Sequence, residues 1–489
     1  MGCGTSKPGL TYEEKLARWR EKGGGDLEPV LASGAVALLD AQWIIRHAEA
    51  GGVLSHRQAL PKEAFLSFAD LVEATDEYDL AVAALSYPWL TKDHPDPRGA
   101  NLARVARALK ALLSHPGITR LGVFWDFGSL HQHPDPPNGV LRTEEQNALF
   151  KQGLGCLGTL YSHQHTRVLR LTSFPDGHKA EEQAEGTNVA KYFDRGWCYT
   201  EACWAGLTKD YDLSLDLGKM RAGVEYDWDS LIGDCIQDGG RRPPLLPSAF
   251  AAELEKKSFT NGKDDKPLVK QLYEAAFKEQ FGKATKLIYI GLGWGDAEAA
   301  QLAEVLASGA APRLEKLWLQ GNKIGDEGCK ALAAALGKEG AAPRLERLYL
   351  NDNEIGDEGC KALAAALGKE GAAPRLWLLD LSRNKISDEG YKALAAALKE
   401  GAAPSLKARD APPRPSPLPR PMLIAPPLAC RGSAWATRSL SWWPSHLSSN
   451  NRGGGSTRPP TRRLDGVDGY CIAGDRSLSA LGQSLGTLA

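Results

Sequence analysis

The sequence predicts an α/β fold in two parts, a parallel sheet covered by helices and an α/β repeat solenoid, preceded by a small N-terminal helical block. Two observations lead to this prediction. Apolar strand-like runs alternate with amphipathic helical stretches over residues 78–216, which is typical of a parallel sheet with helices on both faces. A Pro-Arg-Leu motif then recurs with its arginine at positions 313, 344 and 375, a spacing of 31 residues that indicates a repeat architecture. The 489 residues are enough for two or three folded units.

Charge and cysteine usage narrow the function classes. The formal net charge is −1, from 59 Lys and Arg against 60 Asp and Glu, so no chain-wide positive field favours phosphate backbones and we expect no nucleic acid partner. Nine cysteines are scattered without close pairing through a chain too large to need a disulfide framework, which indicates a reducing, intracellular compartment. No apolar run approaches the roughly 18 to 20 residues of a membrane span, and the start lacks a secretory signal pattern.

The first nine residues predict a lipid anchor. Gly2 follows the initiator methionine and Ser6 stands where the N-myristoylation pattern needs a small hydroxyl residue, while the adjacent Cys3 is placed for palmitoylation. One myristoyl chain binds a membrane only marginally, whereas two acyl chains anchor stably. We therefore expect the protein at the cytoplasmic face of a membrane; the alternative is an unmodified start that happens to begin with glycine.

Residues 10–77 are expected to form the helical block. Val36, Leu39 and Trp43 recur at helical spacing, and Pro61 opens a second helix. Each helix has only a narrow apolar stripe, so the block is expected to pack on the domain that follows.

The α/β domain is assigned to residues 78–216. Its expected strands are 80–85, 121–125, 167–172 and 212–217, and its expected helices are 102–113, 143–161 and 192–207. A ligand cleft in such a sheet lies at the carboxyl ends of the strands. Residues 217–284 are predicted to be a linker with helices, among them one over 267–281.

Residues 285–404 carry the strand pattern of a leucine-rich repeat. The recurring positions are Leu314, Leu317, Leu319, Asn322 and Ile324, then Leu345, Leu348, Leu350, Asn353 and Ile355, then Leu376, Leu379, Leu381, Asn384 and Ile386. The leucines are expected to point inward, the asparagine to bond backbone groups freed where the strand turns, and Asp326 to cap the helix that follows. Cys329 and Cys360 are interpreted as small buried residues, and residues 287–306 as a degenerate first repeat.

The residues between the inward leucines are expected to form a concave binding face. They are Glu315, Lys316, Trp318, Glu346, Arg347, Tyr349, Trp377, Leu378 and Asp380. Exposed aromatics flanked by charge are typical of protein interfaces, so we expect a protein ligand here, unless another part of this chain covers the face. The repeats resemble those of ribonuclease inhibitor and of intracellular immune receptors, a likeness specific to fold and not to ligand.

A second resemblance concerns residues 78–209. Tyr192, then Trp197-Cys198, then Glu201 resemble the helix signature of Toll/interleukin-1 receptor (TIR) domains. Upstream, the run 123–132, Glu145-Gln146, Leu160-Tyr161 and the strand 166–171 look like the heterokaryon-incompatibility domain, a family itself similar to the TIR fold.

This resemblance implies either signalling by assembly, with a possible homo-oligomer, or cleavage of the nicotinamide N-glycosidic bond of NAD. In catalytic TIR domains the glutamate of this helix is essential, and Glu201 matches it. A carboxylate beside the ribose stabilises an oxocarbenium-like transition state. Ser86 and Tyr87 follow the first strand and Asp126 the second, so all three are expected to reach the same cleft, whereas Trp197 and Cys198 are interpreted as core residues.

Several features favour the non-catalytic alternative. Many TIR-like domains only assemble, and Glu201 three residues after a buried cysteine also suits the solvated face of an amphipathic helix. The run 86–89, Ser-Tyr-Pro-Trp, departs from the usual TIR start. If NAD binds, it is expected as a substrate, and no bound cofactor is expected. The sequence contains no nucleotide-binding P-loop.

Two His-Gln-His triplets, at 131–133 and 163–165, offer four imidazoles, but their loop placement and spacing favour solvated histidines and we predict no metal site. The repeat pattern stops after Pro404, because Asp410 and Pro412 stand where inward leucines are due. Residues 405–489 are rich in Pro, Arg and Ser and are predicted to be disordered.

Overall fold

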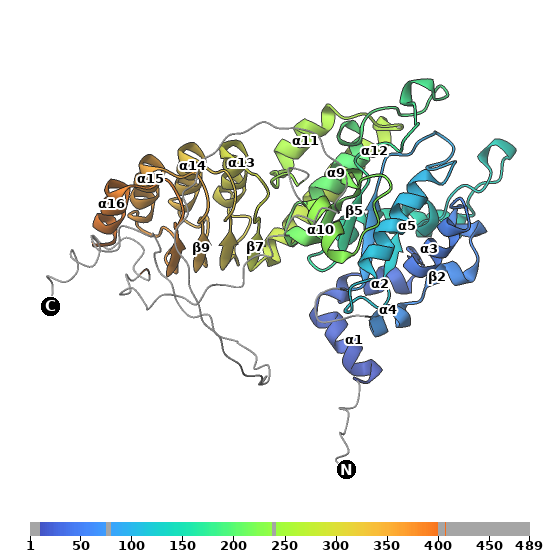
Figure 1. Cartoon of the computed structure of the whole chain (residues 1–489), viewed down its shortest axis with the longest axis horizontal. Helices are drawn as coiled ribbons and strands as arrows, with labels where there is room; N and C mark the ends of the chain where they lie inside the picture. Colours follow the sequence, from blue (N-terminus) through green and yellow to red (C-terminus); the bar gives the residue numbers. More distant parts are fainter. Residues whose placement is uncertain (1–9, 75–79, 237–240, 400–405, 407–489) are drawn as a thin grey trace, which may run out of the picture. The chain divides into compact units, whose positions relative to one another are not determined.

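The computed structural model describes residues 10–74, 80–236, 241–399 and 406 (Figure 1). A six-stranded sheet has the order β2-β1-β4-β3-β5-β6. Its strands are β1 (Leu38–Asp40), β2 (Phe65–Leu66), β3 (Val82–Ser86), β4 (Gly122–Phe124), β5 (Arg167–Arg170) and β6 (Ser214–Asp216). β4, β3, β5 and β6 run parallel to one another, and all four consist entirely of buried residues. The predicted parallel sheet is therefore confirmed, and the burial matches the apolar runs that predicted it.

The prediction of a purely helical block over 10–77 is wrong, because this region adds two strands to the sheet. β1 pairs antiparallel with β4, and β2 pairs antiparallel with β1. Leu38 and Leu39 are buried in the two different cores on either side of the sheet, which requires the two-residue period of a strand. The helix expected from Val36 instead begins at Ala41, where the Asp40 carboxylate accepts hydrogen bonds from the backbone N–H groups of Gln42 and Trp43 at 2.7 and 3.3 Å.

Helices cover both faces of the sheet. Those of the N-terminal region are α1 (Tyr12–Glu21), α2 (Glu28–Ala32), α3 (Ala41–Glu49) and α4 (Phe68–Ala74). Those between the parallel strands are α5 (Ala100–Leu112), the short α6 (Asp126–Ser129), α7 (Glu144–Gly155), α8 (Leu157–Ser162) and α9 (Gly196–Ala205). Phe124 and Val168 share one core with α8 and α9, while Val123 and Leu169 share the other with α3 and α5. The single helix expected over 143–161 is divided at Cys156 into α7 and α8.

Residues 217–284, predicted to be a linker with helices, contribute three helices that complete the two cores. They are α10 (Trp228–Ile236), α11 (Pro247–Glu255) and α12 (Gly262–Lys283). Leu231 of α10 is buried in the core beside α5, whereas Phe250 of α11 and Tyr273 of α12 stack at 3.7 Å between ring centroids in the core beside α9.

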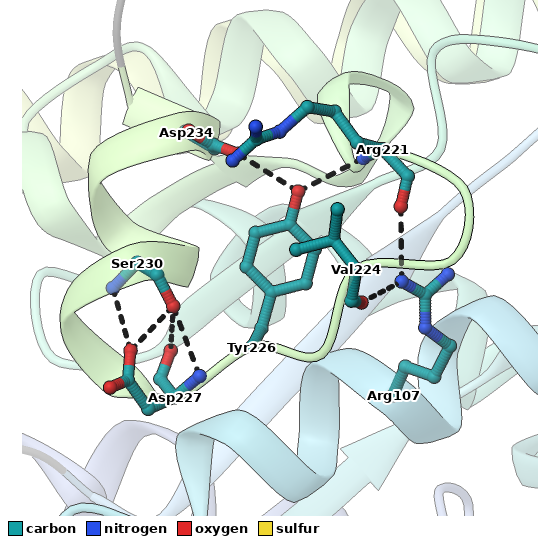
Figure 2. Close-up of polar contacts among 7 residues, drawn as sticks. All are labelled: Arg107, Arg221, Val224, Tyr226, Asp227, Ser230 and Asp234. Carbon is teal, nitrogen blue, oxygen red and sulfur yellow. Dashed lines mark hydrogen bonds and ion pairs between the residues drawn. The ribbon is translucent and has the colours of Figure 1, made fainter. Parts of the chain in front are cut away.

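Polar contacts fasten the segment before α10 to α5 (Figure 2). Arg107 of α5 donates to the carbonyl of Arg221 at 3.0 Å and to the carbonyl of Val224. The hydroxyl of Tyr226 donates to Asp234 at 2.9 Å, and accepts from the backbone N–H of Arg221. Asp227 and Ser230 exchange side-chain-to-backbone hydrogen bonds at the start of α10, in the manner of a helix cap (Figure 2).

The repeat region forms a second parallel sheet of order β10-β9-β8-β7, with one helix after each strand (Figure 1). The strands are β7 (Lys286–Ile288), β8 (Lys316–Trp318), β9 (Arg347–Tyr349) and β10 (Leu378–Asp380). The helices are α13 (Asp296–Ala307), α14 (Asp326–Leu336), α15 (Asp357–Leu367) and α16 (Asp388–Lys399). Lys316 pairs with Arg347, one repeat later, so the repeats are in register. The inward leucines of the first two full repeats and of β10 are at most 1% exposed.

Polar side chains join each repeat to its neighbour. Asn322 accepts from the backbone N–H groups of Leu292 and Trp294 and donates to the carbonyl of Tyr289, as expected of an asparagine where the strand turns. The expected role of Asp326 is wrong in detail. Its carboxylate accepts from the backbone of Gly356 and Gly359, at 2.7 and 2.8 Å, at the start of the next helix.

The register of the repeats predicts the stability of two variants. Leu348→Ala removes a buried side chain and should lower the free energy of unfolding by about 2 to 5 kcal/mol. Trp318→Ala removes a half-buried ring that stacks on Tyr349, and should lower it by about 1 kcal/mol. Urea unfolding of the full chain measures both values. Equal losses in the two variants would mean that the strand register is incorrect.

Candidate functional site

A cavity of about 420 Å³ opens where β3 and β4 end and α9 begins. Its volume falls within the range of small-molecule sites. Tyr87, Asp126 and Glu201 line it, and Ser86 contacts Glu201 from the last position of β3. The structure thus brings together all four predicted site residues, at the edge of the sheet where the topology places ligands.

Glu201 is held by the hydroxyl of Ser86 at the end of β3, which in turn contacts the hydroxyl of Tyr192 in the turn before α9. The hydroxyl of Ser86 donates to Oε2 of Glu201 at 2.5 Å. That hydrogen bond uses the only proton of the Ser86 hydroxyl. The Tyr192 hydroxyl, which lies 2.5 Å from Ser86 Oγ, is therefore the donor of the hydrogen bond between these two residues. The sequence motif included Tyr192, but this role of its hydroxyl was missed.

Asp126 is held separately by three donors. The Tyr87 hydroxyl donates to it at 2.6 Å, the Trp89 indole N–H at 3.0 Å and the backbone N–H of Phe127 at 2.6 Å. Trp89 belongs to the run that departs from the usual TIR start, so this departure supplies a donor to the site. The three bonds fix the Asp126 carboxylate beside the cavity.

Burial dominates the electrostatics of both carboxyls. It raises the pKa of Glu201 well above its ordinary value, with a further increase from the charge of Asp126 and an opposing decrease from the Ser86 hydrogen bond. Burial also raises the pKa of Asp126, against its three donors, which lower it. A cationic group placed in the cavity would lower both pKa values again, so the site favours such a ligand.

The rest of the wall is largely apolar. The lining side chains of this kind are Phe124, Leu130, Phe150, Leu154, Leu157, Trp197 and Phe259. Trp197, expected in the core, is only partly buried and donates its indole N–H to Asp265 of α12 at 3.0 Å. Asp265 and Phe259 belong to residues 217–284, which were predicted to be a linker with helices, and neither residue is part of a motif that would have predicted its place in the site. Cys198 is buried as expected, and burial raises the pKa of its thiol well above the ordinary range.

A second candidate surface is the face of the repeat strands that carries Lys316, Trp318, Arg347, Tyr349 and Trp377, here named the strand face. All five are partly buried, because they cover one another. Trp318 and Tyr349 stack at 5.7 Å between ring centroids, and the guanidinium of Arg347 lies 4.6 Å from the ring centroid of Trp377. The aromatics are therefore less exposed than predicted, whereas the alternation of inward and outward residues is as predicted.

The remaining members of the predicted concave face lie beside these residues. Glu315, Glu346 and Asp380 are partly buried, whereas Leu378 is 5% exposed and offers little surface to a partner. Asp380 accepts from the hydroxyl and backbone N–H of Ser382, which fixes its carboxylate.

The histidine triplets are occupied by contacts within the chain. The Nδ1 atom of His163 accepts from the backbone N–H of His165, so its Nε2–H donates to the carbonyl of Gly23 at 3.1 Å. Burial lowers the pKa of His163 to about 3 and that of His131 to about 4, so both are neutral at pH 7. Within residues 10–74, 80–236 and 241–399, no group of three or more metal-ligating side chains comes together.

Two predicted features lie outside the described residues, namely the acylation sites Gly2 and Cys3 and nearly all of the tail over 405–489. None of the helices that the structure describes combines the length and the apolar character needed to cross a membrane.

Comparison with known families identifies the repeats. A leucine-rich repeat family model matches residues 312–333, 343–364 and 378–395, which include β8, β9 and β10 and parts of α14 to α16. No family model of a TIR or heterokaryon-incompatibility domain matches the chain. No curated protein matches the sequence significantly. The repeats are thus confirmed as leucine-rich repeats, a kind of module that generally binds proteins.

The raised pKa of Glu201 predicts a pH-dependent difference in stability. The folded protein holds the Glu201 proton more tightly than the unfolded chain does, so protonated Glu201 contributes to the free energy of unfolding. This contribution is complete below the ordinary glutamate pKa of about 4.3, and is lost as the pH rises through the pKa of Glu201 in the folded protein. Glu201→Gln cannot ionise. Its free energy of unfolding should therefore rise relative to that of the wild type as pH increases from about 5 to about 9.

Urea unfolding at several pH values measures this difference. The control is Glu145→Gln on the exposed surface of α7, whose difference from the wild type should stay constant over the same range. A constant difference for Glu201→Gln as well would show that its carboxyl does not titrate abnormally.

Proposed function

We propose that the protein is a membrane-anchored intracellular signalling protein, in which leucine-rich repeats arranged as a solenoid bind a protein partner. A TIR-like α/β domain, over residues 78–216, would transmit the signal by assembly. Anchoring through acylated Gly2 and Cys3 at the cytoplasmic face of a membrane would favour that assembly by concentrating the chains on one surface.

The strand face supports the binding half of this proposal. Stacked Trp318 and Tyr349 are rigid aromatic groups, and Arg347 presents a guanidinium held over the ring of Trp377. Trp, Tyr and Arg are the residues that most often dominate protein interfaces, and a surface already fixed by stacking loses little conformational entropy on binding.

Trp318→Ala should weaken partner binding with little loss of stability. Truncating a central aromatic of an interface weakens binding by about 2 to 4 kcal/mol, or at least thirtyfold. Proteins that co-purify with the full chain from its own cells are compared between the wild type, Trp318→Ala and the control Lys361→Ala. Lys361 lies on α15 with its side chain 43% exposed, away from the strands. Equal recovery of the same partner with Trp318→Ala as with the wild type would exclude the strand face as the binding surface.

The hydrogen bond between Ser86 and Glu201 inside a cavity favours a second candidate function, an NAD glycohydrolase. In this reaction the bond between C1′ of the ribose and N1 of nicotinamide breaks, and its electron pair leaves with nicotinamide. Positive charge then develops at C1′, water adds there, and the products are nicotinamide, ADP-ribose and one proton. An assembly module has no need of a buried carboxyl held by a hydroxyl in a cavity of this size.

Glu201 would stabilise the developing charge in this reaction. The positively charged nicotinamide ring lowers the Glu201 pKa when it enters the cavity, and the Ser86 hydrogen bond also favours the ionised form. Ionised Glu201 beside C1′ then opposes the charge that forms there, and accepts the proton of the attacking water. Asp126, fixed by Tyr87 and Trp89, adds a second negative charge near the ring.

Glu201→Gln separates the two functions. If the chain cleaves NAD, nicotinamide release should fall by a factor of hundreds, because losing one preorganised charge at a developing charge costs about 3 to 4 kcal/mol. The exposed control Glu145→Gln should keep the wild-type rate. Release is measured with the full chain at high concentration on lipid vesicles, where assembly is most favoured. No release by the wild type under these conditions would eliminate the enzymatic function and leave the signalling function.

A further inference from the structure

The cavity contains a buried cation that has no counter-ion. Arg195, at the start of α9, lines the cavity and is 6% exposed. Its guanidinium donates to the carbonyls of Ala190 and Trp89, both at 2.7 Å, and pairs with no carboxylate among the residues that the structure describes. Burying an unpaired charge is costly, and a ligand of opposite charge would offset that cost.

Two other positive groups face the same cavity. Gly196, Trp197 and Cys198, the first residues of α9, line it. The N-terminus of a helix carries a partial positive charge and favours anions. Lys92 also lines the cavity, is exposed, and its ammonium forms no ion pair with any described residue.

A further cation, Arg98, lines a second cavity of about 270 Å³, which shares Thr91 with the first. The ring of Phe174 lies 5.7 Å from the guanidinium of Arg195 and 4.9 Å from the ring of His178, which lines the second cavity with Arg98. After burial, the charges of Arg98 and Arg195 are the next largest causes of the lowered His178 pKa, so the three groups lie close together.

The carboxylates around the second cavity do not neutralise Arg195, Lys92 and Arg98. Glu182 of the second cavity pairs with Lys179 at 2.6 Å, and Glu181 only partly offsets the two arginines at His178. The acidic side chains that line the first cavity are Glu201, Asp126 and Asp265, and the last of these accepts from the indole of Trp197. The cations without a counter-ion among the described residues lie at Arg195, Lys92 and Arg98. A ligand with a positive ring and a negative phosphate matches this division of charge.

We propose that Arg195, the start of α9 and Lys92 form a subsite for the phosphate of a nucleotide whose ribose lies beside Glu201. The position of the ribose rests on the proposed cleavage of the glycosidic bond, whereas the phosphate subsite rests on the unpaired cations alone. The second cavity, with Arg98 and His178, then receives the part of the ligand beyond the phosphate.

The test compares two probes that differ only by a phosphate, nicotinamide mononucleotide and nicotinamide riboside. Calorimetric titration uses the full chain carrying Glu201→Gln, so that the probes are not consumed. The mononucleotide should bind roughly ten- to hundredfold more tightly than the riboside, and its affinity should fall as salt is added.

Variants of Arg195 and Lys92 test whether these two cations cause the difference in affinity between the mononucleotide and the riboside. Arg195→Lys keeps a positive charge but cannot hold both carbonyls and a phosphate, so it should weaken mononucleotide binding about tenfold and leave riboside binding unchanged. Lys92→Gln, at an exposed position, should weaken it several-fold even if Arg195→Lys fails to fold. Lys151→Gln, an exposed lysine of α7 outside the cavity lining, should change neither affinity.

Equal affinities for the two probes, or binding of neither, would overturn the phosphate subsite. An equal loss of affinity for both probes in Lys92→Gln would also overturn it. If the mononucleotide binds through Arg195 and Lys92 while the wild-type chain releases no nicotinamide from NAD, the glycohydrolase function fails and the subsite stands.

Discussion

The hydrogen bond between Ser86 and Glu201 is the interaction on which the arrangement of the cavity depends. It joins the carboxyl end of β3 to the second turn of α9, and places a buried carboxyl at the point where the two elements meet. A partly buried carboxyl without a partner would destabilise the fold, so this hydrogen bond helps to fix the position of α9 over β3. Arg195 adds to this, because it donates to the carbonyl of Trp89 in the segment that follows β3.

The same helix links the cavity to the repeats. The indole of Trp204, in the last turn of α9, stacks on Tyr161, whose hydroxyl donates to the last carbonyl but one of β3, that of Leu85. Just beyond α9, the carbonyl of Leu207 accepts from the hydroxyl of Tyr289, which follows β7 in the first repeat. These contacts are continuous from the cavity to β7.

The periodic parts of the molecule were predictable, and the parts that depend on distant partners were not. Leu317 and Leu348 recur with their neighbours at a fixed period, so their burial follows from local spacing alone. Leu39 instead fits a helical spacing with Val36 and Trp43, and lies in a strand because β4, some 80 residues later in the chain, supplies Val123 as its pairing partner. At the site, Ser86, Asp126 and Glu201 follow from strand ends and one motif, whereas Asp265 has no local signal and reaches the cavity only through the packing of α12.

A crystal structure of the full chain with nicotinamide mononucleotide would show whether this cavity holds a nucleotide between Glu201 and Arg195. In crystals of Glu201→Gln, we expect the ribose C1′ next to the side chain of residue 201 and the phosphate within hydrogen-bond distance of Arg195. Density for the nucleotide elsewhere on the chain, or a cavity that stays free of it at saturating concentration, would contradict the account.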